Sequence, residues 1–350
     1  MSPSEGRKGH SQGGDGLTVA VTGATGDIGR ATLGYLDRSP QVGKVIGMAR
    51  SPFDPAAHGF SEKVTYRRGD VLDREAVKEC VADADVVMHL AFIIFGDPHE
   101  AQEINVEGSR NVFEAAVECG AKRLVYTSSV ASYGFHPDNP QPLTEDVSPR
   151  GTDGFYYSAH KAELEALLDA VTADAAIDTY VFRPCIVAGP DAITFVETAV
   201  KMLPIYGQLR TARRLIDEMP FVAPVIPDPG VPFQLIHHDD VATALVAAVE
   251  GNGEPGRYNL AADGLLKMGD FARALGWRAI PAPGRLVGPV DDLLARVPGL
   301  PAEVAWLTAF RVAVVMDTDK AKDQLGWQPS HDAIETLNLT VEGAREKDAI

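Results

Sequence analysis

The stretch LTVAVTGATGDIGR, residues 17–30, decides the fold that this sequence predicts. Residues 17–21 form a short apolar run rich in β-branched side chains, which is the pattern of a buried strand. The run ends in three glycines, Gly23, Gly26 and Gly29, with the spacing G-x-x-G-x-x-G. We expect the first to allow a tight strand-to-helix turn, the second to let a pyrophosphate approach the backbone, and the third to let the helix pack on the sheet.

Phosphates bound at such a loop meet free N–H groups at the positive end of the helix that follows. A glycine triplet alone is weak evidence, because all loops are rich in glycine, but a triplet between a strand and a helix is far more specific. The sequence therefore predicts a dinucleotide-binding loop, with an ordinary glycine turn as the alternative. The expected cofactor contacts in this loop are Gly23, Thr25, Gly26, Asp27, Ile28 and Gly29.

Predicted strands and helices alternate along the first half of the chain. After the first strand, further strands are expected at residues 44–49, 63–68, 85–90, 123–127 and 179–183. Helices are expected at residues 27–37, 73–82, 98–119 and 155–171. This order implies right-handed βαβ crossovers, and hence a doubly wound α/β (Rossmann) fold with a parallel sheet covered on both faces.

The chain divides into three predicted parts. Residues 1–16 are polar and rich in Gly and Ser, which predicts a disordered tail, and residues 17–189 form the dinucleotide-binding domain. Six prolines between residues 204 and 232 break up the sequence that follows. Residues 190–350 are therefore expected to form mostly a smaller substrate-binding domain over the carboxyl edge of the sheet. Its expected elements are strands at 233–236 and 257–260, the second returning to the main sheet, and helices at 239–250, 302–315 and 318–325.

Composition narrows the class of protein. The chain has 32 Lys and Arg against 49 Asp and Glu, a net charge of −17, which disfavours nucleic acid and anionic membranes as partners. Its three cysteines are scattered and have no C-x-x-C spacing, which predicts reduced cytoplasmic thiols and no zinc site. No apolar run is long enough to span a bilayer, and no signal-peptide core is visible near the start. We expect a cytoplasmic protein that acts on a small molecule.

A second constellation carries the chemistry. Tyr157 and Lys161 are four residues apart at the start of a predicted helix, so their side chains share one face. A nearby ammonium favours the phenolate, so we expect Lys161 to lower the pKa of Tyr157 from its usual value of about 10. Ser129 follows the strand predicted at 123–127 and can donate to a carbonyl oxygen that gains negative charge. The alternatives are a surface tyrosine above a solvated lysine and a serine that caps a turn.

The order of these motifs resembles that of the extended short-chain dehydrogenase/reductases, also called the NAD-dependent epimerase/dehydratase family. The resemblance spans about residues 17–330. Besides the glycine loop and Tyr157 to Lys161, it is carried by GDV at 69–71, HLA at 89–91, NVEG at 105–108, SSVASYG at 128–134, PLTE at 142–145, RP at 183–184, GP at 189–190, HHDDVA at 237–242 and LGWQP at 325–329.

This resemblance implies hydride transfer to or from a nicotinamide. Tyr157 would be the general acid or base, and Lys161 would hold the nicotinamide ribose and lower the tyrosine pKa. The third catalytic residue that the resemblance implies is a serine, and Ser129 matches it better than Ser128. The further cofactor contacts that the resemblance implies are Asp70 and Val71 at the adenine, Leu90 and Ala91 along the cofactor, and Pro184 near the nicotinamide. Asn105 matches a family asparagine, and a structural helix–strand hydrogen bond is its alternative role. Homodimers are frequent in the family, so a homodimer is possible here.

The end of the second strand usually separates NAD from NADP. A carboxylate there accepts from the ribose 2′-hydroxyl, whereas an arginine pairs with a 2′-phosphate. Residues 48–51 are MARS, so no Asp or Glu occupies the expected place, and Arg50 is present with Ser51 as a possible hydroxyl partner. We therefore favour NADP over NAD. The alternatives are that Arg50 stacks on the adenine of NAD or faces solvent.

Three functions compete. The first is a carbonyl reductase or alcohol dehydrogenase acting on a ketone or secondary alcohol, which we favour. The second is a nucleotide-sugar epimerase or dehydratase similar to UDP-glucose 4-epimerase, but many such enzymes carry Asn and Tyr where this chain has Ile186 and Ala188. The third is a dinucleotide sensor without catalysis, which the complete set of Ser129, Tyr157 and Lys161 disfavours.

Several polar residues have two interpretations. His160 can tune Tyr157 or be a partly exposed helix residue. His237 and His238 do not have the pattern of metal ligands, and Asp239 or Asp240 is expected to cap the following helix. A basic cluster at residues 210–214 can face a substrate anion or solvent.

Overall fold

The computed structural model describes residues 16–94, 97–201, 224–282 and 311–350. Its centre is a seven-stranded sheet in the order β10-β6-β5-β4-β1-β2-β3, in which every neighbouring pair is parallel. The strands are β1 (Leu17–Thr22), β2 (Val42–Ala49), β3 (Val64–Arg68), β4 (Val86–His89), β5 (Arg123–Thr127), β6 (Asp178–Pro184) and β10 (Gly256–Leu260). This sheet confirms the predicted doubly wound α/β class. The strand order reverses between β1 and β4, where ligands of such sheets bind.

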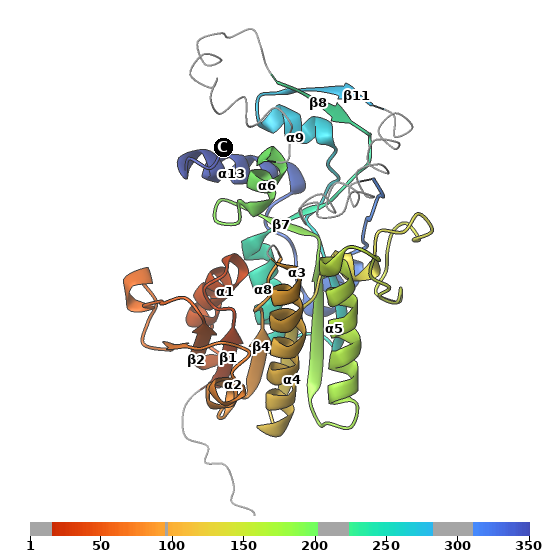
Figure 1. Ribbon diagram of the computed structural model, residues 1–350. Coiled ribbons are helices and arrows are strands. Elements are labelled where there is room, and N and C mark those ends of the chain that lie inside the picture. The colour runs from red at the N-terminus through yellow and green to blue at the C-terminus, as the bar shows by residue number, and fades with distance from the viewer. Residues whose placement is uncertain (1–15, 95–96, 202–223, 283–310) are drawn as a thin grey trace, which may run out of the picture.

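Helices cover both faces of the sheet (Figure 1). On one face α1 (Asp27–Arg38) packs against α8 (His238–Val249), and together they bury one set of sheet side chains. On the other face lie α2 (Arg74–Val81), α4 (Gly108–Glu118) and α5 (Tyr156–Thr172), over a second apolar cluster. Alternate residues of each strand supply the two clusters, because side chains on a strand point to opposite faces in turn.

The helix expected at 98–119 is three consecutive segments. They are α3 (Pro98–Gln102), a π-helical segment η2 (Glu103–Glu107) and α4. A π turn adds one residue to the helical repeat and re-aims its side chains. Here the buried Asn105 turns toward the loop after β4.

A smaller group of elements lies beyond the carboxyl edge of the sheet, in the upper part of Figure 1. It contains the parallel pairs β7 (Ile186–Ala188) with β9 (Leu235–His237) and β8 (Val225–Asp228) with β11 (Arg278–Pro281). Its helices α6 (Thr194–Lys201), α9 (Met268–Ala274) and α13 (Ala333–Glu346) share a third apolar cluster with these strands. The sequence did not predict β7, β8, β11 or these three helices. The basic cluster at 210–214 and the expected tail, apart from Gly16, lie outside the described residues.

The prediction of a helix at 302–315 is wrong for residues 311–315, the part of this range that the structure describes. Residues 311–315 have no helical structure. The N–H of Leu143 donates to the Val315 carbonyl at 2.7 Å, and the N–H of Asp317 donates to the Leu143 carbonyl at 2.8 Å. The segment is therefore held extended by a loop distant in sequence, and the next helix is α12 (Asp319–Leu325).

Candidate active site

The glycine loop turns from β1 into α1 at the carboxyl edge of the sheet. Gly23 has φ +77°, and a Cβ on it would lie 2.5 Å from the Ala91 nitrogen, so both backbone conformation and space require glycine. A Cβ on Gly29 would lie 2.2 Å from the Gly23 carbonyl oxygen, because α1 runs close to the turn. Gly26 differs, since a Cβ there would meet only that oxygen, at 3.5 Å.

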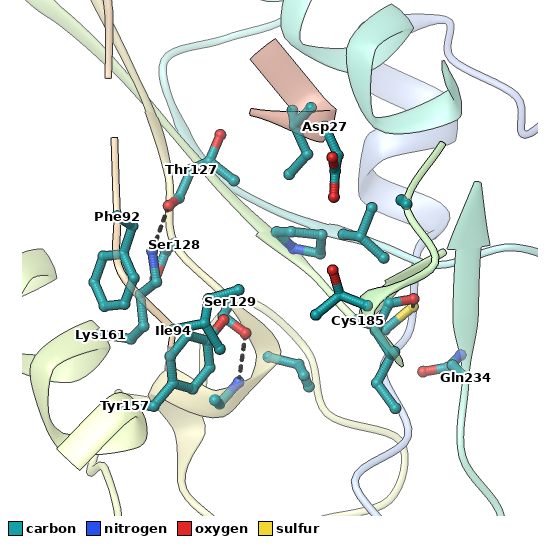
Figure 2. Close-up of a pocket in the computed structure, with 18 of the residues that line it drawn as sticks. Asp27, Phe92, Ile94, Thr127, Ser128, Ser129, Tyr157, Lys161, Cys185 and Gln234 are labelled. Atoms are coloured by element: carbon teal, nitrogen blue, oxygen red, sulfur yellow. Dashed lines mark hydrogen bonds between the residues drawn. The ribbon is translucent and has the colours of Figure 1, made fainter. Parts of the chain in front are cut away.

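A cavity of about 420 Å³ opens from this loop along the ends of β4, β5 and β6. It brings together ten of the residues singled out from the sequence, which lie on five separate segments of the chain. Figure 2 labels four of them: Asp27, Ser129, Tyr157 and Lys161. These lining residues are Gly23, Gly26, Asp27, Ile28, Gly29, Leu90, Ser129, Tyr157, Lys161 and Pro184. The expected catalytic group and most of the glycine loop therefore border one space.

The other expected cofactor contacts do not line this cavity. Thr25 is a half-buried residue of the glycine loop, and Ala91 follows Leu90 after β4. Asp70 and Val71 follow β3, where the Asp70 carboxylate accepts from the Leu72 N–H at 3.0 Å. Arg50 follows β2, with its side chain 52% exposed and 4.0 Å from Glu100. These positions continue the same sheet edge away from Tyr157.

The two serines after β5 have different partners. Ser128 lines the cavity and donates to the buried Glu165 carboxylate at 2.6 Å. The Ser129 hydroxyl accepts from the Ala131 N–H at 3.1 Å and also forms a side-chain hydrogen bond with Tyr157. Ser129 therefore caps a turn, as its alternative interpretation held, and also contacts the phenol.

Burial dominates the electrostatics of Tyr157. The side chain is 8% exposed and packs edge-to-face on Phe92, with ring centroids 5.5 Å apart. Burial raises the pKa of Tyr157 to about 12, while the hydrogen bond with Ser129 acts in the opposite direction. The expected lowering by Lys161 is wrong for this arrangement, in which the phenol is a protonated acid at neutral pH.

Lys161 is turned from the tyrosine toward the strand. Its ammonium donates to the Thr127 carbonyl at 2.9 Å and lies 3.7 Å from the ring centroid of Phe92. Burial lowers the pKa of Lys161 to about 7, against the attraction of the Glu165 carboxylate one turn along α5. The lysine can therefore gain or lose a proton near neutral pH inside the site.

A buried ion pair supports this wall. Arg183 donates two hydrogen bonds to Glu165, at 2.9 and 2.6 Å, and both side chains are almost completely buried. Although burial raises the pKa of Glu165, hydrogen bonds and charge from Arg183 outweigh it and lower the pKa. The pair joins β6 to α5 directly beneath Ser128 and Lys161.

Asn105 and His160 lie together in the interior, next to the loop after β4. Asn105 accepts from the Ile93 N–H at 2.8 Å and donates to the Ile93 carbonyl at 3.0 Å, which fixes the loop after β4 to the π turn. His160 is 4% exposed, not partly exposed, and its ring nitrogen lies 3.5 Å from the Asn105 amide. The alternative of a structural hydrogen bond thus describes Asn105.

Three histidines form a stacked column at the start of α8. The ring of His237 lies 4.3 Å from that of His238 and 4.1 Å from that of His331. His237, not Asp239 or Asp240, caps α8, because its Nδ1 accepts from the Asp239 N–H at 3.2 Å. Possible metal-ligand atoms of His237, His238 and Asp239 lie within 4.8 Å of one another. The rings are stacked, however, and one nitrogen of His237 already accepts the capping hydrogen bond, so this arrangement suits a helix cap better than a metal site.

Sequence reasoning missed most of the cavity wall. Besides Tyr157, aromatic and aliphatic side chains line the cavity, among them Phe92, Ile94, Val130, Phe135, Ile186, Val231, Phe233, Val312 and Val314. They come from six separate segments, so no local pattern joins them. Thr127, the last residue of β5, also lines the cavity, and its place two residues before Ser129 was a usable signal.

The residues of the loop fit a dinucleotide. The N-terminus of α1 has no side-chain hydrogen bond at its cap, so its first N–H groups are available to an anion. Gly26 is exposed and leaves open the space that a Cβ would occupy. Both observations match the requirements for binding a pyrophosphate at the end of β1.

Residues 19–261 match the model of the NAD dependent epimerase/dehydratase family. The chain belongs to this family, and so to the enzymes that include NAD-dependent oxidoreductases, epimerases and dehydratases. Cinnamoyl-CoA reductase 1 of Petunia hybrida is 28% identical over 276 residues, covering 74% of this chain and 77% of that protein. An uncharacterized protein of Mycobacterium tuberculosis is 28% identical over 93% of this chain, which spans only 30% of that protein's length.

Solved structures share the fold. The UDP-glucose 4-epimerase of Thermotoga maritima, solved with UDP-glucose, has a TM-score of 0.69 and 20% identity, covering 95% of this chain and 99% of its own. The Bordetella bronchiseptica enzyme WbmH, solved with NAD+, has a TM-score of 0.67 and 20% identity, covering 94% of this chain and 99% of its own. None of the helices in the described part of the chain is both long and apolar enough to cross a membrane.

Proposed function

We propose that this enzyme is an NADP-dependent reductase whose substrate is an aldehyde or ketone that is otherwise apolar. In the reverse direction it oxidises the corresponding alcohol. The observation that carries the proposal is the apolar wall of the cavity that Tyr157 lines. Among the described lining residues, Lys161 is the one basic side chain, and its ammonium already donates to the Thr127 carbonyl. A nucleotide-sugar substrate needs partners for its diphosphate, and Ile186 offers none.

The residues divide the chemistry among themselves. The dinucleotide, when bound, supplies or accepts the hydride. Tyr157, protonated at neutral pH, donates its proton to the carbonyl oxygen as negative charge develops there. Ser129 donates to the same oxygen and orients Tyr157. The apolar wall excludes water and holds the body of the substrate.

NADP as the preferred cofactor is part of the proposal. Arg50 follows β2, residues 48–51 include no carboxylate, and the exposed contact with Glu100 at 4.0 Å leaves the guanidinium available. We expect Arg50→Gln to weaken NADPH binding about tenfold and to leave NADH binding nearly unchanged, because only NADPH carries the 2′-phosphate. Fluorescence titration measures both, with Arg67→Gln on β3 as the matched control. Equal losses for the two cofactors, or a wild type that prefers NADH, would contradict this choice.

The substrate class is tested with purified protein and NADPH. We expect cinnamaldehyde and aryl ketones to be reduced, and Tyr157→Phe to lower turnover about 10²–10⁴-fold while NADPH binding is kept. UDP and UDP-glucose serve as the competing probes in a thermal-shift assay. Stabilisation by UDP, or epimerisation of a UDP-sugar, would support the nucleotide-sugar alternative instead. Cofactor binding with no turnover of either class would support the sensor alternative.

The cytoplasmic location and the possible homodimer stay predictions. The three cysteines are free thiols, as expected of a reducing compartment, and burial raises the pKa of Cys80 to about 11, which makes this thiol unreactive.

A further inference from the structure

Thr127 carries an unusual buried hydroxyl. The side chain is 8% exposed, yet its Oγ1 has no hydrogen-bond partner among the described residues. Its carbonyl, in contrast, accepts from Lys161 at 2.9 Å. A buried hydroxyl without a partner costs stability, so such groups in native proteins call for an explanation.

The two serines that follow Thr127 are engaged. Ser128 donates to Glu165, and Ser129 accepts from the Ala131 N–H and bonds to Tyr157. The three consecutive hydroxyls at the end of β5 therefore differ in kind. The two serine hydroxyls have hydrogen-bond partners within the protein, whereas that of Thr127 has none among the described residues and is available to a ligand.

The side chain of Thr127 faces the cofactor side of the sheet. Tyr126 is buried among the helices α2, α4 and α5, so the next residue of the strand projects to the opposite face. There Thr127 borders the cavity, which Ile28, Leu90 and Pro184 also line. In Figure 2 Thr127 lies between Asp27 of the glycine loop and Tyr157.

We propose that the Thr127 hydroxyl is a further cofactor-binding group that hydrogen-bonds the ribose–phosphate part of the nicotinamide half of the dinucleotide. The inference rests on the proposed function, because it needs the pyrophosphate at Gly26 and the nicotinamide beside Tyr157. A dinucleotide so placed has its ribose between these two points. Ribose hydroxyls and phosphate oxygens both suit a threonine hydroxyl, which donates one hydrogen bond and accepts others.

The test is a pair of variants at this position, titrated with NADPH by fluorescence. Thr127→Val keeps the shape and removes the hydroxyl, and we expect its Kd for NADPH to rise about three- to tenfold. Thr127→Ser keeps the hydroxyl and should bind nearly as wild type does. Without cofactor, Thr127→Val should melt at the same temperature or higher, because it removes a buried hydroxyl that has no partner.

Thr336→Val is the matched control. Thr336 lies in α13, is fully buried, has a hydroxyl with no partner among the described residues, and does not line the cavity. Its substitution should change the melting temperature in the same direction and leave the Kd unchanged. Nicotinamide mononucleotide and adenosine 2′,5′-bisphosphate are the two halves of NADP, and only binding of the first should weaken in Thr127→Val.

The outcomes separate the two proposals. If wild type binds NADPH and Thr127→Val binds it equally well, or if binding of adenosine 2′,5′-bisphosphate weakens as much as that of the mononucleotide, the role of Thr127 is refuted alone. A fall in melting temperature without cofactor would also refute it, since the hydroxyl would then have a structural partner. If wild type binds neither NADPH nor NADH, the proposed function itself fails.

Discussion

At the scale of single residues, Tyr157 and Lys161 show how burial sets protonation. Both lie on one face of α5, yet burial raises the pKa of the phenol to about 12 and lowers that of the amine to about 7. Each shift favours the neutral form, as removal from water does. The tyrosine is therefore suited to donate a proton, and the lysine becomes charged as pH falls through neutrality.

We expect Lys161→Met to stabilise the protein most at low pH. Below about pH 7 the lysine is protonated in both folded and unfolded states, so the buried charge costs its full penalty. Between this pH and the unfolded value of 10.5 it is charged only when unfolded, and the penalty shrinks as pH rises.

Melting temperatures of wild type and Lys161→Met between pH 6 and 10 measure this difference. The gap should be largest at pH 6 and close toward pH 10. The control is Lys122→Met, which changes an exposed lysine directly before β5, and no such trend is expected there. A gap independent of pH would contradict the lowered pKa.

At the scale of elements, two glycines of the β1–α1 turn meet different requirements. Gly29 makes room for the helix, since a Cβ would overlap the Gly23 carbonyl oxygen at 2.2 Å, whereas Gly26 faces open space. One glycine is required by the fold, and the other is expected to be required by the ligand.

We expect Gly29→Ala and Gly26→Ala to separate stability from binding. Gly29→Ala should unfold at a clearly lower temperature, because the helix must move off the turn. Gly26→Ala should melt near wild type without cofactor but bind NADPH at least tenfold more weakly, because its methyl group occupies the approach of the pyrophosphate. Calorimetry and fluorescence titration measure the two effects. Unimpaired NADPH binding by Gly26→Ala would place the pyrophosphate elsewhere.

At the scale of the whole molecule, one polar network ties the site to both parts of the chain. Arg183 on β6 holds Glu165 on α5 and donates to the Tyr133 hydroxyl at 2.7 Å. That hydroxyl donates to Asn259 on β10, which in turn donates to the Leu143 carbonyl at 3.1 Å. Leu143 pairs with the 315–317 segment next to the cavity wall.

We expect Arg183→Met to lower the free energy of unfolding by about 3–5 kcal/mol, because Glu165 is left buried without its main partner. The double variant Glu165→Met with Arg183→Met should recover part of this loss. Arg257→Met removes a half-exposed partner of the same carboxylate and should cost about 1 kcal/mol or less. Urea unfolding measures all three. A single variant as stable as wild type would show that other groups satisfy Glu165.

Local patterns carried much of the fold. The glycine loop, the alternation of elements and the positions of Tyr157 and Lys161 were visible because each depends on residues near one another in sequence. The helix α13 also had a local signal, since Asp332 caps it through the Glu335 N–H at 2.8 Å, but it was missed. The segment at 311–315 had apolar residues typical of a helix and is extended, because Leu143 pairs with it.

By itself, the sequence determined the class of this protein, a parallel α/β sheet with a dinucleotide loop at its first turn. The reason is that the spacing of apolar residues and glycines along the chain is enough to specify a strand, a turn and a helix. Only the tertiary structure decided the apolar wall around Tyr157, the state of its proton and the unmatched hydroxyl of Thr127. Those features depend on which distant segments exclude water from one point, and burial from water has no signature in any single stretch of chain.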